Sequence, residues 1–261
     1  MNRTPITPDL DTFPPVFHPL LNNAAVFDSS CSQAARVWLI DRDGGCFLKT
    51  APKGTLAQEA ALTRFFHSKG LGAEVLSYES LDADWLLTRR IPGEDCLDPM
   101  YLEDPLRMCD TTAELLRMLH ETDPAGCPIP DRTGLFLESA QHCWETKSYD
   151  MSLFPDNWGY VSPEDAWAVL EQNGKYLKSD TLLHGDYCLP NIMLDNWRFT
   201  GFIDLDAGGV GDRHLDLFWG IWSLAFNLKT DAYRDRFLDV YGRDKVCEDV
   251  FPVISALEVF L

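Results

Sequence analysis

Two carboxylates and one amide lie close together in the sequence, in a stretch whose residue types could carry out phosphoryl transfer. Asp186 and Asn191 follow a histidine with the spacing His-x-Asp-x-x-x-x-Asn, and Asp204 comes after a short apolar run. Phosphoryl transfer needs a carboxylate that accepts the proton of the acceptor hydroxyl, and Mg2+ prefers amide and carboxylate oxygens. The pattern therefore predicts Asp186 as the catalytic base and Asn191 and Asp204 as metal ligands.

Each of these residues also has an ordinary structural explanation when it is taken alone. An isolated aspartate usually caps a helix or lies on the surface, and an isolated asparagine usually lies in a turn. Here the polar residues are combined with short apolar runs that resemble strands, namely 182–183, 192–194 and 202–203. This combination favours catalysis, whereas His184 is interpreted as a structural residue that organises the loop.

The N-terminal third of the chain, which must position part of this motif, has the pattern of strands with one helix between them. Residues 36–49 contain two apolar runs joined by a glycine turn, which predicts a hairpin. Thr55 is predicted to cap a helix that continues to Lys69 and stops at Gly70. Residues 73–90 again look extended. A small, strand-rich lobe is therefore expected.

The larger part of the chain carries apolar residues at helical spacing, from Pro105 and Leu106 to Leu119. Together with the first region, this pattern predicts an α+β chain with a β-rich lobe over residues 1–90 and a larger helical lobe over residues 91–261. Further helices are expected after Ser162, over residues 214–228, over residues 231–241 and from Glu248 onward.

Several residues at the start of one predicted helix are given structural roles. Asp212 and Asp216 lie where a carboxylate can cap free backbone amides or pair with Arg213. Trp219 and Trp222 lie on an apolar helix without basic neighbours. The tryptophans are therefore predicted to be core residues rather than a platform on which a base stacks.

The composition limits the class of protein. The chain has 261 residues, of which 46% are hydrophobic, and a formal net charge of -19. It can bury a sizeable core, and its charge argues against binding to nucleic acid and is compatible with a cationic partner. The eight cysteines are scattered singly and are read as reduced thiols. Because no stretch resembles a signal peptide or a membrane span, a cytoplasmic protein is expected.

The stretch HGDYCLPNIMLDNWRFTGFIDLDAGGVGDRHLDL resembles the signature of the aminoglycoside phosphotransferases, in particular of the 3'-phosphotransferase (kanamycin and neomycin kinase) group. The resemblance extends over residues 20–261 and becomes weaker between residues 130 and 178. It implies a two-lobed, protein-kinase-like fold. It also implies Mg2+ as a cofactor and ATP or GTP as the phosphate donor.

The resemblance also assigns the binding of the nucleotide to particular residues. Ser32 belongs to a loop that lacks the GxGxxG of protein kinases and would contact phosphate through hydroxyl and amide groups. Lys49 ends a strand and Glu59 lies on the next helix, so the two can form an ion pair that directs the ammonium to the phosphates. Arg89 and Ile91 belong to the connector whose backbone would contact the purine.

Binding of a polycationic substrate is implied for Asp206, Glu258 and Leu261. Aminoglycosides carry several ammonium groups, and kinases of this family bind them with carboxylates. The chain departs from the family pattern in this respect, because Leu257 stands where an aspartate is usual and Asp206-Ala207 replaces Gly-Arg. The loop at residues 156–160 also looks shorter and less acidic than the corresponding substrate loop. These departures leave the kinase prediction intact and the acceptor open.

The leading prediction is an O-phosphotransferase that moves the γ-phosphate of a nucleotide to a hydroxyl of an aminoglycoside, as a monomer or dimer. One alternative is a kinase of the same fold that acts on another small alcohol, such as a peptide antibiotic, a sugar or choline. Another is a binding module without catalysis. The presence of all the expected catalytic and metal-binding residues disfavours that module.

Overall fold

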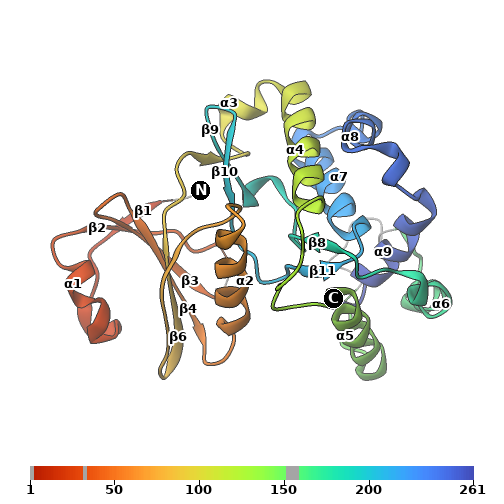
Figure 1. Ribbon diagram of the computed structural model, residues 1–261. Helices are drawn as coiled ribbons and strands as arrows, with labels where there is room; N and C mark the ends of the chain where they lie inside the picture. Colours follow the sequence, from red (N-terminus) through yellow and green to blue (C-terminus); the bar gives the residue numbers. More distant parts are fainter. Residues whose placement is uncertain (1–2, 32–33, 151–158) are drawn as a thin grey trace. The chain divides into compact units, whose positions relative to one another are not determined.

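The computed structural model describes residues 3–31, 34–150 and 159–261 (Figure 1). Its packing divides the chain into two units. The first unit comprises Met1–Cys96 and Pro190–Asp206, and the second comprises Leu97–Leu189 and Ala207–Leu261. Residues 91–96 and 190–206 thus pack with the N-terminal strands. The predicted division into residues 1–90 and 91–261 was based on the roles of the two lobes, and it stays a prediction.

The first unit is built on an antiparallel sheet with the strand order β1-β2-β3-β4-β6-β5. The predicted hairpin is β3 and β4, in which Val37 lies opposite Lys49 and Leu39 lies opposite Phe47. The predicted extended region is β5 and β6. The bounds of the strands are β1 Thr4–Ile6, β2 Ala25–Asp28, β3 Arg36–Asp41, β4 Cys46–Pro52, β5 Val75–Ser80 and β6 Ala83–Arg89.

The two faces of this sheet have separate apolar clusters. Trp38 and Trp85 stack on one face at 6.0 Å between ring centroids, and Phe13 packs edge-on against Trp38. On the other face, Leu86 packs with Ala60 of the helix α2 (Ala57–Ser68). Adjacent residues of β6 therefore point to opposite faces, as the period of two in a strand requires. This arrangement fixes α2, and with it Glu59, against the sheet.

The start of α2 differs from the prediction. Thr55 does not cap the helix, because its hydroxyl donates to the backbone oxygen of Pro52. The buried carboxylate of Asp84 instead accepts hydrogen bonds from the amides of Gly54 and Leu56 at 2.9 and 3.0 Å. These and two hydroxyl donors outweigh the cost of burial and lower the pKa of Asp84 to about 2. The predicted end of the helix, at Gly70, is confirmed.

A small sheet in the first unit carries the second half of the motif. Its strand order is β10-β9-β7, with bounds Arg198–Phe202, Ile192–Asp195 and Glu94–Asp95. The amide of Phe202 donates to the backbone oxygen of Leu71 at 2.7 Å, which ties this sheet to the segment after α2. Asn191 immediately precedes β9, and Asp204 follows β10.

The second unit is helical, with one pair of short strands, so the α+β class is confirmed. The predicted helices appear as α4, α6, α7, α8 and α9, whereas α3 and α5 were not predicted. The bounds are α3 Pro99–Leu102, α4 Pro105–His120, α5 Arg132–Thr146, α6 Pro163–Asn173, α7 His214–Leu228, α8 Arg234–Tyr241, α9 Phe251–Glu258, β8 Thr181–Leu183 and β11 Gly209–Gly211. The short helix α1 (His18–Leu21) belongs to the first unit.

The core of the second unit forms where α5, α6, α7 and α9 bring their apolar faces together. Leu215, Ile254, Leu257 and Phe260 are fully buried there. Leu106, which was placed on the apolar face of its helix, is instead 53% exposed, because it lies in the first turn of α4, before the buried face begins at Met108. Within the described ranges, each helix is too short or too polar to span a bilayer.

Candidate active site

Three charged residues of the first unit form a cluster, which we call the Lys49 ion cluster. Lys49 on β4 donates from Nζ to Glu59 of α2, at 2.9 Å to Oε1 and 2.7 Å to Oε2. The same Nζ lies 3.1 Å from Oδ1 of Asp204. Glu59 is buried, whereas the side chain of Asp204 is 55% exposed. The predicted ion pair is confirmed as a contact, and its role toward a nucleotide stays a prediction.

The charges of the Lys49 ion cluster act on one another. Burial disfavours the ammonium, but the carboxylates of Glu59 and Asp204 outweigh that cost, so the pKa of Lys49 lies above its ordinary value. Burial also raises the pKa of Glu59, and the ammonium opposes this effect. One ammonium thus faces two carboxylates, and the more exposed carboxylate is available for a further cation.

The two predicted metal ligands lie next to each other in the first unit. The amide of Ile203 donates to the backbone oxygen of Asn191 at 3.1 Å, which brings the end of β10 beside the start of β9. Asp204 follows with a left-handed backbone, at a φ of 58°. Among the described residues, no group of three or more His, Cys, Asp or Glu side chains could hold a metal ion. An Asn amide and an Asp carboxylate nevertheless fit Mg2+, which normally takes its other ligands from water and phosphate.

Asp206 also has a partner in the first unit. The side-chain amide of Gln58 on α2 donates to the backbone oxygen of Asp206 at 2.8 Å and lies 3.3 Å from its Oδ1. Gln58 is adjacent to Glu59 in the sequence, so α2 contacts the segment after β10 at two successive residues. The predicted contact between Asp206 and a substrate stays a prediction.

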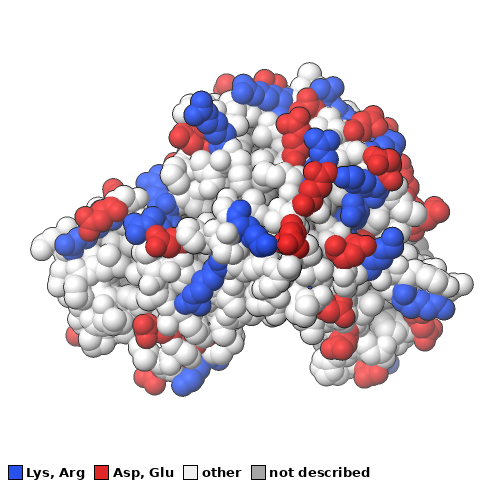
Figure 2. Space-filling model, in the orientation of Figure 1, with Lys and Arg blue, Asp and Glu red and all other residues white. Residues whose placement is uncertain are grey.

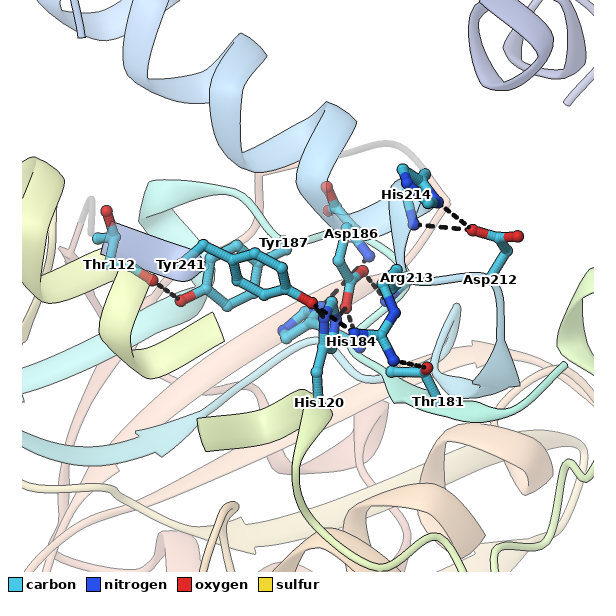
Figure 3. Close-up of polar contacts among 12 residues, drawn as sticks. Thr112, His120, Thr181, His184, Asp186, Tyr187, Asp212, Arg213, His214 and Tyr241 are labelled. Atoms are coloured by element: carbon cyan, nitrogen blue, oxygen red, sulfur yellow. Dashed lines mark hydrogen bonds and ion pairs between the residues drawn. The ribbon is translucent and has the colours of Figure 1, made fainter. Parts of the chain in front are cut away.

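The loop that carries Asp186 belongs to the second unit. Asp216 on α7 is fully buried, and its carboxylate accepts hydrogen bonds from the amides of His184 at 2.7 Å and Gly185 at 2.8 Å. Gly185 has a φ of 87°, and a Cβ atom there would lie 1.9 Å from the backbone oxygen of Ala207. The amide of Asp186 in turn donates to Nδ1 of His184 at 3.3 Å (Figure 3). These contacts agree with the structural roles expected for Asp216 and His184.

The same loop is also held on its C-terminal side. The hydroxyl of Tyr187 donates to the backbone oxygen of Thr112 at 2.7 Å (Figure 3), and the amide of Leu189 donates to the hydroxyl of Ser223 at 2.9 Å. Helices α4 and α7 therefore hold the residues that follow Asp186. Asp186 itself is half-buried, so its carboxylate lies on a loop that is fixed on both sides.

Asp212 also has the structural role that was predicted. Its carboxylate accepts from Nδ1 of His214 at 2.6 Å and from the amide of Lys178 at 2.9 Å. Burial of Asp212 opposes ionisation, but these hydrogen bonds outweigh it and lower its pKa. The amide of Cys247 donates to Nε2 of His214 at 2.9 Å. This chain of contacts connects the start of α7 with segments on either side of it.

Glu258, near the C-terminus, is a buried carboxyl in the second unit. Its Oε1 accepts a hydrogen bond from Nε1 of Trp219 at 3.1 Å. Burial, with a smaller contribution from the charge of Asp186, raises the pKa of Glu258 to about 8. Trp219 is half-buried, so its prediction as a core residue is incomplete. Leu261, the third candidate for substrate binding, is 48% exposed, and the roles of Glu258 and Leu261 toward a substrate stay predictions.

Several other candidates are located without a test of their roles. The side chain of Arg89 forms an ion pair with Glu74 at 2.7 Å, and Ile91 is buried against Met193. The prediction that this connector contacts a purine therefore concerns backbone groups alone. Ser32 and residues 156–158 of the predicted substrate loop lie outside the described residues.

The net charge is not concentrated on the face drawn in Figure 2, where acidic and basic side chains are interspersed. Surface ion pairs also connect helices of the second unit, for example Arg236 of α8 with Asp110 of α4 at 2.6 Å. The charge on this face therefore does not indicate a site for a cationic ligand, and attraction of such a ligand must be argued from individual carboxylates such as Asp204.

Comparisons with known proteins identify the family of the chain. Residues 26–251 match the family described as the phosphotransferase enzyme family. The chain is 46% identical over 253 residues to a probable aminoglycoside 3'-phosphotransferase of Lactococcus lactis, which covers 97% of this chain and 96% of that protein. It is 29% identical over 218 residues to an aminoglycoside 3'-phosphotransferase of Niallia circulans, with coverage of 82% and 83%.

Solved structures show the same fold. The crystal structure of an aminoglycoside 3'-phosphotransferase of type VIII is similar with a TM-score of 0.75 at 26% identity, over 89% of this chain and 91% of that one. An aminoglycoside phosphotransferase of Streptomyces rimosus in complex with ADP and streptomycin has a TM-score of 0.68 at 22% identity, over 87% and 91%.

Proposed function

This chain belongs to the phosphotransferase enzyme family as one of its aminoglycoside phosphotransferases, and on that premise we propose that it transfers the γ-phosphate of ATP or GTP to a hydroxyl of an aminoglycoside. The observation that carries the proposal is the position of Lys49, whose Nζ lies within 3.1 Å of both Glu59 and Asp204. An ammonium held between two carboxylates is suited to bind phosphate oxygens without moving.

The proposed chemistry divides among a few side chains. Asp186 orients the acceptor hydroxyl and takes its proton, and the amides that Asp216 holds fix the loop for that task. Asn191 and Asp204 would hold Mg2+, which would supply charge neutralisation at the phosphates. Lys49 binds the phosphates while Glu59 holds its ammonium in place. Phosphoryl transfer mainly needs positioning and electrostatic stabilisation, and these residues provide both.

The acceptor is a cationic small molecule in this proposal, and the reaction takes place in the cytoplasm. Glu258 supports the first point, because burial keeps its carboxyl protonated up to about pH 8, and an ammonium bound beside it would lower that pKa and stabilise the carboxylate form. Leu257 limits the comparison with the family, because it is fully buried where the family pattern has an aspartate. The accepted set of aminoglycosides is therefore expected to be narrower than is usual in the family.

The test is a coupled assay of ADP or GDP release with kanamycin, neomycin and a peptide antibiotic as separate acceptors, and with ATP and GTP as separate donors. The Asp186→Asn variant provides the control for contaminating activity. We expect turnover with at least one aminoglycoside. Turnover of none of them at millimolar concentration would refute the proposed acceptor, and turnover of the peptide antibiotic alone would support the alternative of another small alcohol.

A further inference from the structure

A hydroxyl, an imidazole and a carboxylate form a buried chain in the second unit, which we call the loop support. The hydroxyl of Tyr241 on α8 lies 2.8 Å from Nδ1 of His120 on α4, and Nε2 of His120 lies 3.1 Å from Oδ2 of Asp216 on α7. All three residues are buried. Because Asp216 binds the amides of His184 and Gly185, the loop support ends at the loop that carries Asp186 (Figure 3).

The protonation of this chain follows from its chemistry. Burial lowers the pKa of His120 and raises the pKa of Tyr241 to about 12, so both side chains are neutral at physiological pH. A neutral imidazole has one N–H group. Since the carboxylate of Asp216 acts only as an acceptor, that N–H must be at Nε2, and Nδ1 must accept a hydrogen bond.

Tyr241 is placed to donate a hydrogen bond to Nδ1 of His120. Arg213, whose guanidinium can only donate, lies 3.4 Å from the hydroxyl oxygen of Tyr241, and its other nitrogen lies 3.2 Å from the hydroxyl of Thr181 (Figure 3). The hydroxyl oxygen therefore accepts from Arg213, which leaves its hydrogen directed toward His120. The rings of His120 and Tyr241 pack edge to face, with their centroids 5.6 Å apart.

We propose that Tyr241 is a positioning residue of the phosphotransferase, because its hydroxyl fixes the tautomer in which His120 donates to Asp216 and so holds the loop of Asp186. The proposal rests on the proposed function for its kinetic consequences. In the other tautomer, Nε2 would point a lone pair at the carboxylate, and one anchor of Asp216 would be lost. Tyr241 reaches no reacting atom in this scheme and acts only through His120 and Asp216.

The first test is Tyr241→Phe, which keeps the ring and removes the hydroxyl. Because one neutral hydrogen bond is lost, we expect kcat to fall about threefold to tenfold while KM for the nucleotide and the acceptor changes by less than about twofold. Tyr78→Phe is the matched control, since it removes a hydroxyl that donates to a carboxylate, Asp84, in the first unit. In that control kcat should stay within about twofold of the wild type.

The second test separates positioning from a general structural effect. A glutamine at position 120 has an amide that can donate to Asp216 and has no tautomers. In the His120→Gln background, Tyr241→Phe should therefore change kcat by less than about twofold. A fall of the same size as in the wild-type background would overturn the proposal, because Tyr241 would then act independently of His120.

The third test needs no substrate. 15N NMR of histidine-labelled protein distinguishes a protonated from an unprotonated ring nitrogen, and His120 is assigned as the signal that His120→Gln removes. We expect the Nε2–H tautomer in the wild type and a mixture of tautomers in Tyr241→Phe. An imidazolium or the Nδ1–H tautomer in the wild type would overturn the proposal, whereas failure of all aminoglycosides to react would affect only the proposed function.

Discussion

The Lys49 ion cluster and the loop support differ in what surrounds their charges. In the ion cluster, the carboxylate of Asp204 is largely exposed and shares one ammonium with Glu59. In the loop support, Asp216 is fully buried and accepts hydrogen bonds from two backbone amides and one imidazole. The first arrangement has capacity for a ligand, and the second has a carboxylate already occupied by the protein.

This difference predicts how each region responds to substitution. Groups that wait for a ligand should affect the binding of that ligand, whereas groups that hold a loop should affect kcat through Asp186. The distinction follows from geometry, because an exposed carboxylate exchanges partners with solvent and a buried one cannot do so without a large cost. The following changes, in order of expected effect, test whether the two regions separate in this way.

Asp186→Asn should have the largest effect. The substitution keeps the shape of the side chain and removes the group that accepts the proton, so kcat should fall by about 10²-fold or more. The affinity for nucleotide should stay nearly unchanged, because binding is assigned to other side chains. Steady-state kinetics together with a nucleotide titration measure both quantities. If the variant keeps more than about half of its turnover, Asp186 is not the base.

Asp204→Ala should show that the Lys49 ion cluster affects nucleotide binding, in contrast to the loop support, which should affect kcat. The loss of a metal ligand and of a partner of Lys49 should weaken Mg2+-dependent binding of nucleotide by about tenfold or more. Calorimetric titration with and without Mg2+ measures this change. Asp195→Ala, at the exposed end of β9, is the matched control and should bind nucleotide like the wild type. Equal affinity for Mg2+-nucleotide in Asp204→Ala and the wild type would contradict the assignment.

The limits of the sequence can be seen at the same two regions. The hairpin that carries Lys49 and the helix that ends at Gly70 were predictable, because strand period and glycine signals are local. The cap of α2 was not, since its acceptor, Asp84, lies 28 residues after Leu56. The sequence favours the local candidate Thr55, because nothing in it indicates which distant carboxylate returns to a helix start.

The loop support shows the same limit more strongly. The spacing of the catalytic motif identified Asp186, and the position of Asp216 at a helix start indicated a structural carboxylate. His120 lies 96 residues from Asp216 and 121 residues from Tyr241, so no periodicity connects the three. A histidine at the end of an apolar helix, followed much later by a tyrosine before a glycine, was the only signal, and it indicates helix ends rather than a shared network.

Glu258→Gln tests a buried carboxyl that belongs to neither region and whose pKa is raised. The unfolded carboxyl loses its proton near its ordinary pKa, whereas the folded one keeps it up to about 8, so the folded state binds more protons between these values. The wild type should therefore lose stability as pH rises through this window, and the glutamine variant should not. We expect the variant to gain at least about 1 kcal/mol relative to the wild type between about pH 5 and about pH 8.

Urea unfolding of both proteins at the two pH values measures this difference. A constant difference between them would contradict the shifted pKa. Addition of a reactive aminoglycoside at the higher pH should reduce the difference, because an ammonium stabilises the carboxylate of Glu258 and has less effect on a glutamine. KM for the aminoglycoside should accordingly rise in the variant, while KM for the nucleotide stays the same.

Arg89→Ala should have the smallest effect, and it tests a charged residue that lies outside both regions. The ion pair with Glu74 is exposed on both sides, with side chains 50% and 45% accessible, so water and salt screen it and it contributes little to stability. The nucleotide is predicted to contact the backbone of this connector, and the substitution leaves the backbone in place. We therefore expect KM for the nucleotide to change by less than about twofold. Glu74→Ala is the control, because it breaks the same ion pair and should leave KM for the nucleotide unchanged. If KM rises more than about twofold in Arg89→Ala alone, the guanidinium itself contacts the nucleotide. The charges that bind the nucleotide would then extend beyond the Lys49 ion cluster.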